Sequence, residues 1–225
     1  MSNALTYAKL VQIAGTTEGK YSNVQWDAAK ALGYNITQEI WGGVGEHVSF
    51  GFVANSAQET VIAFRGTAIE KLLEWVEAAN CDLASFGPGK RVHEGFYSVY
   101  ESLDIDDISP RKVILCGHSL GAALATLLAL DSDFSTQAVY TFGSPRVGDT
   151  AFVTVYDRTI PQTFRYVNRY DIVPSLPPSN LGYKHVGTEF RLNGPFELDL
   201  AKNHELTSGY LTNLAGAELY EQKGA

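Results

Sequence analysis

The sequence predicts an α/β protein in which a mostly parallel central sheet carries helices on both faces. The segment Thr60–Phe64 has no polar alternation after its first residue, which is typical of a strand buried on both faces. Candidate strands recur along the chain and are separated by stretches with helical spacing. This alternation indicates a parallel sheet that is covered on both sides.

The spacing of apolar residues predicts the individual helices and strands. Helices are expected at residues 4–14, 24–32, 69–76, 94–103 and 120–130, with a last helix that begins near His204 or a few residues later. Strands are expected at residues 47–54, 60–65, 112–116, 138–142, 163–167 and 186–192. The turn-like residues 55–59 join the first two strands, which add an antiparallel edge. Because no repeat or linker divides the chain, residues 1–225 are expected to form a single domain.

The charge balance excludes some classes of partner. The 225 residues include 17 Lys and Arg against 25 Asp and Glu, which gives a formal net charge of -8. Nucleic acids and anionic membrane surfaces attract basic proteins, so neither is expected to be the main partner. No segment approaches the roughly 20 apolar residues of a transmembrane helix, so no membrane span is expected.

The N-terminus and the cysteines bear on the cellular location of the protein. Residues 1–9 lack the basic start and apolar stretch of a signal peptide. Cys81 and Cys116 are too few for a disulfide framework, and Cys116 lies in an apolar run where it is expected to pack in the core. We therefore expect a cytoplasmic protein, or a secreted one if a leader has been removed.

The run Gly-His-Ser-Leu-Gly at 117–121 contains the candidate nucleophile, Ser119. An apolar strand precedes it and a helix follows it, and so sharp a turn exposes the serine hydroxyl. Gly117 and Gly121 stand where a side chain would collide with the neighbouring strand and helix. The helix N-terminus then offers free amides to a developing oxyanion. The alternative is an ordinary turn whose serine caps the helix.

Further motifs accompany this run. They are Ala-Phe-Arg-Gly-Thr at 63–67, Val-His-Glu-Gly-Phe-Tyr at 92–97, Thr-Phe-Gly-Ser-Pro-Arg-Val-Gly at 141–148 and Asp-Ile-Val-Pro at 171–174. In this order they resemble the class 3 lipases, an α/β-hydrolase family that includes fungal triacylglycerol lipases and feruloyl esterases. The resemblance implies an α/β-hydrolase fold and hydrolysis of carboxylic esters. Residues 1–45 match no motif of the family.

The resemblance also implies the oxyanion hole. Thr67 occupies the position after the family's Arg-Gly pair, and the amide of Leu120 supplies the second donor. Thr67 closes a buried strand, from which a loop amide is able to point at the site.

Asp171 is the candidate acid. The chain order in α/β-hydrolases is serine, acid, histidine. Asp171 follows the strand at 163–167, beyond the carboxyl end of the sheet, where α/β sites collect. Its role would be to fix the tautomer of the base and to stabilise the imidazolium. Asp149 and Asp157 also follow the serine, but they lie in loop or helix context.

Five histidines compete for the role of base. His47, His93 and His118 precede the serine and break the order, and His118 is expected to point away from its neighbour. His185 and His204 remain, and the residues alone leave the two close to even. The resemblance favours His204, next to the last helix, and implies a structural role for His185 in Tyr-x-His-x-Gly.

These residues indicate ester hydrolysis through an acyl-enzyme intermediate, with no metal and no organic cofactor. The chain lacks the common zinc and dinucleotide motifs. We expect a lipase or esterase whose substrate is a small-molecule or lipid ester, acylglycerols above all, with transient contact to a lipid interface. A feruloyl-type esterase or phospholipase is the alternative, followed by a non-catalytic binding protein on a hydrolase scaffold.

The amphipathic residues 69–76 leave one question open. They directly follow the oxyanion segment, where fungal lipases have a lid helix that opens at a lipid interface. The alternative is a helix that buries its apolar face in the core. The chain is also shorter than the fungal members and lacks their disulfides.

Overall fold

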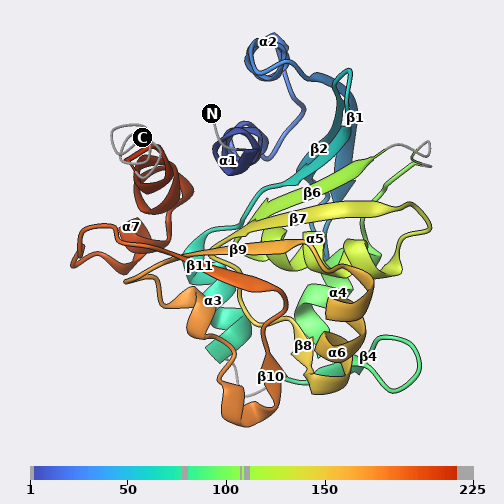
Figure 1. Cartoon of the computed structure of the whole chain (residues 1–225), viewed down its shortest axis with the longest axis vertical. Coiled ribbons are helices and arrows are strands. Elements are labelled where there is room, and N and C mark those ends of the chain that lie inside the picture. Colours follow the sequence, from blue (N-terminus) through green and yellow to red (C-terminus); the bar gives the residue numbers. More distant parts are fainter. Residues whose placement is uncertain (1–2, 78–80, 107, 109–111, 217–225) are drawn as a thin grey trace.

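Seven strands form the central sheet of the computed structural model, which describes residues 3–77, 81–106, 108 and 112–216 (Figure 1). In spatial order the strands are β1 (Asn35–Gly42), β2 (Val48–Asn55), β3 (Thr60–Phe64), β6 (Val113–His118), β7 (Thr136–Phe142), β9 (Thr163–Asn168) and β11 (Thr188–Leu192). The pairs β1–β2 and β2–β3 are antiparallel. The strands from β3 to β11 are parallel. A mostly parallel sheet with an antiparallel edge is what the sequence predicts.

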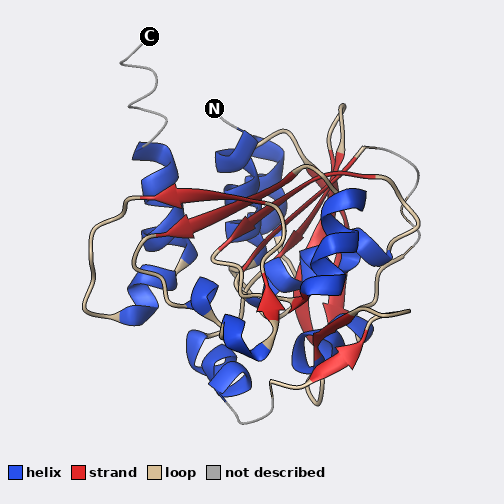
Figure 2. Ribbon diagram, turned by 60° about the horizontal axis from the view of Figure 1, so that its bottom comes forward, coloured by secondary structure: helices blue, strands red, loops and turns tan. Residues whose placement is uncertain are grey.

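Helices cover both faces of this sheet (Figure 2). They are α1 (Asn3–Ala14), α2 (Asn23–Ala31), α3 (Ile69–Glu77), α4 (Glu94–Glu101), α5 (Leu120–Asp131), α6 (Thr150–Thr159) and α7 (Leu200–His204). The side chains of β3 alternate between two core clusters. Ile62 and Phe64 pack with α3, α4, α5 and α6, whereas Val61 and Ala63 pack with α1 and the C-terminal helical segment. All five residues of β3 are buried, which confirms the expectation for this strand.

Several elements are absent from the sequence prediction. The strand β1 and the helix α6 are two of them. A four-stranded sheet is the third, with the order β10 (Tyr183–Lys184), β8 (Gly148–Asp149), β5 (Arg91–His93) and β4 (Leu83–Ser85). This small sheet lies beside α6, away from the central sheet (Figure 1).

The C-terminal part differs from the expectation in one respect. The short helix α7 precedes the last helical segment and ends at His204. The last segment begins at Leu206, as expected, but its first six residues, Leu206–Leu211, form a π-helical turn. His204 therefore lies at a junction between two helical pieces, and this junction determines where its side chain points.

The burial of Cys116 and the length of the helices bear on two expectations drawn from the sequence. Cys116 is fully buried in β6, as predicted for a small core residue. Within the described ranges, none of the helices has the length and apolar character needed to traverse a bilayer.

Candidate active site

Ser119 lies at the sharp turn between β6 and α5. Its backbone has φ 56 and ψ -125, and no other non-glycine residue in the described part of the chain has a positive φ. Such a conformation costs of order 1–3 kcal/mol and persists only where the surrounding structure imposes it. A Cβ at Gly117 would collide with the carbonyl of Gly121, and a Cβ at Gly121 would collide with the carbonyl of Arg65. Both glycines are thus needed for the predicted reason.

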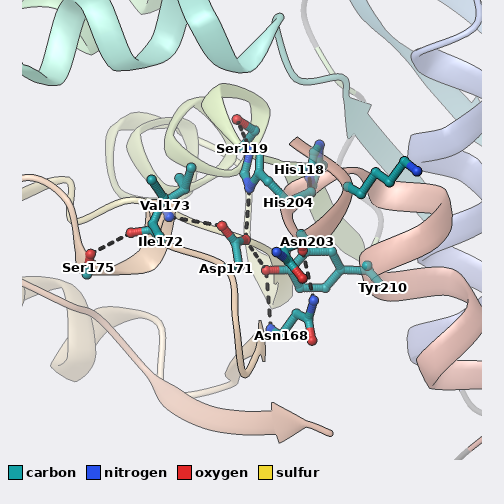
Figure 3. Close-up of polar contacts among 12 residues, drawn as sticks. His118, Ser119, Asn168, Asp171, Ile172, Val173, Ser175, Asn203, His204 and Tyr210 are labelled. Carbon is teal, nitrogen blue, oxygen red and sulfur yellow. Dashed lines mark hydrogen bonds and ion pairs between the residues drawn. The ribbon is translucent and has the colours of Figure 1, made fainter. Parts of the chain in front are cut away.

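The Ser119 side chain makes no capping hydrogen bond to α5, so the interpretation as a capping serine is wrong. Its Oγ lies 2.8 Å from His204 Nε2, and His204 Nδ1 lies 2.8 Å from Asp171 Oδ2. Asp171 is acceptor-only when ionised, so the Nδ1–H donates to it and Nε2 is left to accept the serine proton. Figure 3 shows the imidazole between the serine and the carboxylate. The structure joins the three residues in the predicted order.

Asp171 is held by two further donors. Its side chain is fully buried, and Oδ1 accepts a hydrogen bond of 2.9 Å from the Val173 amide. The hydroxyl of Tyr210 donates to Oδ2, the oxygen that also faces His204 (Figure 3). Burial and the neighbouring Asp171 raise the pKa of Tyr210 well above its ordinary value, so this phenol stays protonated. Tyr210 is not among the predicted site residues, because no local pattern connects it to the site.

His118 also contacts His204, through its backbone and its ring. Its Nε2–H donates to the backbone carbonyl of His204 at 2.7 Å, and the two ring centroids are 4.7 Å apart. Burial, and then the neighbouring His204, lower the pKa of His118 to about 3, so its ring is neutral near pH 7. His118 is expected to point away from its neighbour Ser119, and its side chain contacts the backbone carbonyl and ring of His204.

The competing residues contact other parts of the chain. His185 donates from Nε2 to the carbonyl of Pro174 at 2.7 Å, and burial lowers its pKa to about 4. It therefore braces the loop that contains Asp171. Asp149 accepts a hydrogen bond from the Phe152 amide at the start of α6, and Asp157 accepts one from the Gly187 amide.

The loop with Thr67 lies directly against Ser119, the candidate nucleophile. A Cβ at Gly66 would come within 3.0 Å of Ser119 Cβ, so the backbone of this loop touches the turn. Arg65 fixes the loop by donating from Nε to the Ser49 carbonyl at 2.6 Å and from Nη1 to the Gly66 carbonyl at 2.9 Å. Leu120 is the first residue of α5, and an amide at this position has no acceptor within its own helix.

A cleft of about 680 Å³ reaches His204. One wall is α1, a second is the Arg65–Thr67 loop with the start of α3, and the third comes from α7 and the residues on either side of it. Ser119 itself is fully buried, and Leu72 and Val76 of α3 pack in the same core cluster as Leu120. Among the described residues, no group of three or more His, Cys, Asp or Glu side chains is placed to hold a metal ion.

A parallel sheet, a serine at a strand-to-helix turn and a Ser-His-Asp hydrogen-bond chain together define an α/β hydrolase. The model of the class 3 lipase family matches residues 61–181, and the chain belongs to this family.

Relatives of known name agree with this membership. The chain is 31% identical over 199 residues to the secreted mono- and diacylglycerol lipase 1 of Fusarium solani, with 80% of this chain and 57% of that protein covered. It is 34% identical over 155 residues to a lipase of Rhizomucor miehei, with 60% and 42% covered. The solved lipase of Rhizopus microsporus var. chinensis is 26% identical, with a TM-score of 0.66 over 85% of this chain and 74% of that one. The chain thus spans about half the length of these curated relatives.

Proposed function

We propose that the chain is a serine carboxylic ester hydrolase that acts on acylglycerols or related esters. The observation that carries this proposal is the pair of 2.8 Å contacts from Ser119 Oγ through His204 to Asp171. The proposed class of substrate follows the relatives, which include a mono- and diacylglycerol lipase. Ser119 is the proposed nucleophile, His204 the base and Asp171 the acid, all within one hydrolase domain.

The reaction then proceeds in two steps. His204 Nε2 accepts the hydroxyl proton as Ser119 Oγ attacks the ester carbonyl carbon, and the same proton goes to the departing alcohol. Water then gives a proton to His204 and attacks the acyl carbon, and His204 returns that proton to Ser119 Oγ as the acyl–oxygen bond breaks and the acid leaves. The amides of Thr67 and Leu120 are the proposed donors to the oxyanion of both tetrahedral intermediates.

We further propose that α3 opens when the protein meets a lipid surface. Ser119 is fully buried, so a bulky ester reaches its hydroxyl only after surrounding side chains move. The apolar side chains of α3, Leu72 and Val76, pack beside Leu120 in the core, and a lipid surface offers them an apolar environment in exchange.

Three substitutions test the assignment of the base. Ser119→Ala and His204→Ala should each lower kcat/KM for a soluble p-nitrophenyl butyrate by roughly 10⁴- to 10⁶-fold, because the three side chains act as a unit. His185→Ala should keep labelling of Ser119 by a fluorophosphonate and lose stability instead, since its contact is with Pro174. A folded, active His204→Ala beside an inactive His185→Ala would contradict the assignment. A wild-type chain that neither hydrolyses esters nor reacts with the fluorophosphonate would refute the proposed function.

A further inference from the structure

Three large apolar side chains stand out on the loop that leads into α7. Phe196 is 59% exposed, Leu198 is 90% exposed and Leu200 is 48% exposed. They alternate with two exposed acids, Glu197 and Asp199. We call residues 196–200 the apolar loop. Figure 1 shows the stretch that joins β11 to α7 at the margin of the molecule, away from the body of the sheet.

The backbone of the apolar loop is firmly held. The buried side chain of Asn203 donates from Nδ2 to the Glu197 carbonyl at 2.7 Å and to the Asp199 carbonyl at 3.3 Å, and its Oδ1 accepts from the Glu197 amide at 3.1 Å. The Asn203 carbonyl in turn accepts a hydrogen bond of 2.8 Å from Asn168 Nδ2. These contacts hold the main chain in a conformation that leaves Leu198 in water and Leu200 partly exposed, while the Phe196 ring meets the Tyr170 ring edge-on and is otherwise exposed.

The apolar loop borders the cleft that reaches His204. Asp199, Ala201 and Lys202 line this cleft, and Leu200 lies between the first two in the chain. On the opposite side the cleft is lined by Ile69 and Glu70 at the start of α3. A surface that covers the apolar loop therefore lies next to residues that line the cleft.

The two acids that alternate with the apolar side chains, Glu197 and Asp199, limit the kind of surface that is able to cover the apolar loop. A protein partner, or a second copy of this chain, would bury Glu197 and Asp199 together with the apolar side chains, and buried unpaired charges are costly. At a lipid–water boundary the acids remain hydrated while the apolar side chains enter the acyl region. The two acids and the formal charge of -8 also disfavour anionic lipids. The surface that fits is that of a neutral lipid aggregate.

We propose that Phe196, Leu198 and Leu200 dock the protein on neutral lipid aggregates and so bring the cleft beside His204 to the lipid surface. The choice of an acylglycerol aggregate rests on the proposed function. Docking and hydrolysis depend on different residues, because the hydrogen bonds that join Ser119, His204 and Asp171 involve none of these three side chains.

The test compares two triple variants. Phe196→Ser/Leu198→Ser/Leu200→Ser removes the apolar loop's side chains, and Val24→Ser/Val155→Ser/Leu181→Ser removes three exposed apolar side chains elsewhere on the surface. Binding to a triolein emulsion coated with phosphatidylcholine is measured by flotation, in a Ser119→Ala background that leaves the lipid intact. The loop variant should bind at least tenfold more weakly than its parent, and the control variant should bind like the parent. With Ser119 restored, hydrolysis of soluble p-nitrophenyl butyrate should stay within twofold for both.

Other outcomes overturn the proposal. Unchanged flotation of the loop variant would show that the loop does not dock, and a parallel loss on the soluble ester would show that it acts through the active site. A change of sedimentation coefficient from dimer to monomer would show an interface between two copies. If the triple variant does not fold, Leu198→Asp and Leu198→Phe replace it, with loss and retention of flotation expected. If the wild-type chain binds the emulsion but hydrolyses no ester, the proposed function fails and the docking surface stands.

Discussion

At the scale of single residues, one carboxylate oxygen serves two donors. Asp171 Oδ2 accepts from His204 Nδ1 and from the hydroxyl of Tyr210, while the Tyr210 oxygen itself lies 3.3 Å from the Asn168 amide that donates to it. A carboxylate that also accepts a hydrogen bond from a phenol stabilises an imidazolium less strongly. Tyr210 therefore competes with His204 for the same oxygen of Asp171.

Tyr210→Phe tests this role. Without the phenol, Asp171 stabilises the imidazolium more strongly, and the base holds its proton to higher pH. The acid limb of the kcat/KM profile should therefore move to higher pH. The free energy of unfolding should fall by about 1–3 kcal/mol, since a charged acceptor and the Asn168 amide lose a partner. Tyr170→Phe is the matched control and should change neither. A purely structural role would give the loss of stability with an unmoved pH profile.

Sequence motifs identify the three side chains of the proposed triad but not the residues that contact them. Ser119, Asp171 and His204 stand in motifs with a fixed order and a mechanistic reason for each residue type. Tyr210 comes six residues after His204, within the π-helical turn Leu206–Leu211, and no motif connects it to Asp171. Gly143 has φ +61 and a Cβ there would lie 2.9 Å from Asp171 Oδ2, which no sequence pattern discloses.

At the scale of elements, α3 packs in the core and affects access to Ser119, the proposed nucleophile. Its residues Leu72 and Val76 are buried in the cluster that also contains Leu120 and Val173, next to the site. This packing fits a core helix and equally fits a closed lid, since both bury the same face. The two roles differ in whether α3 leaves its place before Ser119 reacts.

Leu72→Ala distinguishes the two roles. Truncating a buried leucine should lower the free energy of unfolding by about 2–5 kcal/mol in either case. If α3 moves, the weaker packing favours the open state, and a fluorophosphonate should label Ser119 several-fold faster at a fixed pH. Leu10→Ala truncates an equally buried leucine on α1 and should destabilise the chain without faster labelling. Equal labelling rates in both variants would assign α3 to the static core.

The elements absent from the sequence prediction have physical reasons for their weak signals. β1 is an edge strand of the sheet, six of its eight residues are exposed or half-buried, and its residues Asn35–Gly42 offer no apolar run. Half of the ten residues of α6 are β-branched, which disfavours a helix by local propensity. Tertiary contacts override this preference, because Asp149 caps the first turn and Phe152 and Tyr156 are fully buried one turn apart.

At the scale of the whole molecule, the fold keeps His118 and His185 neutral well below the pH at which a free histidine takes up its proton. His118 lies at the end of β6 with a pKa lowered to about 3, and His185 lies beside Pro174 with a pKa lowered to about 4, in both cases chiefly by burial. Each ring takes up its proton near pH 6.5 once the chain unfolds. Between these values the unfolded state binds more protons than the folded state, so the free energy of unfolding falls as the pH falls.

Acidification from pH 7 to pH 5 should therefore cost about 2 kcal/mol for each of the two histidines, a window in which most carboxylates stay ionised. Urea unfolding at the two pH values measures the loss. In His185→Asn, whose amide is able to replace the donor to Pro174, the loss should shrink by about 2 kcal/mol because one of the two titrating rings is gone. His47→Asn removes a histidine whose side chain is 63% exposed and should leave the loss as it is in the parent. A parent chain that is equally stable at pH 7 and pH 5 would show that the buried rings take up their protons without unfolding.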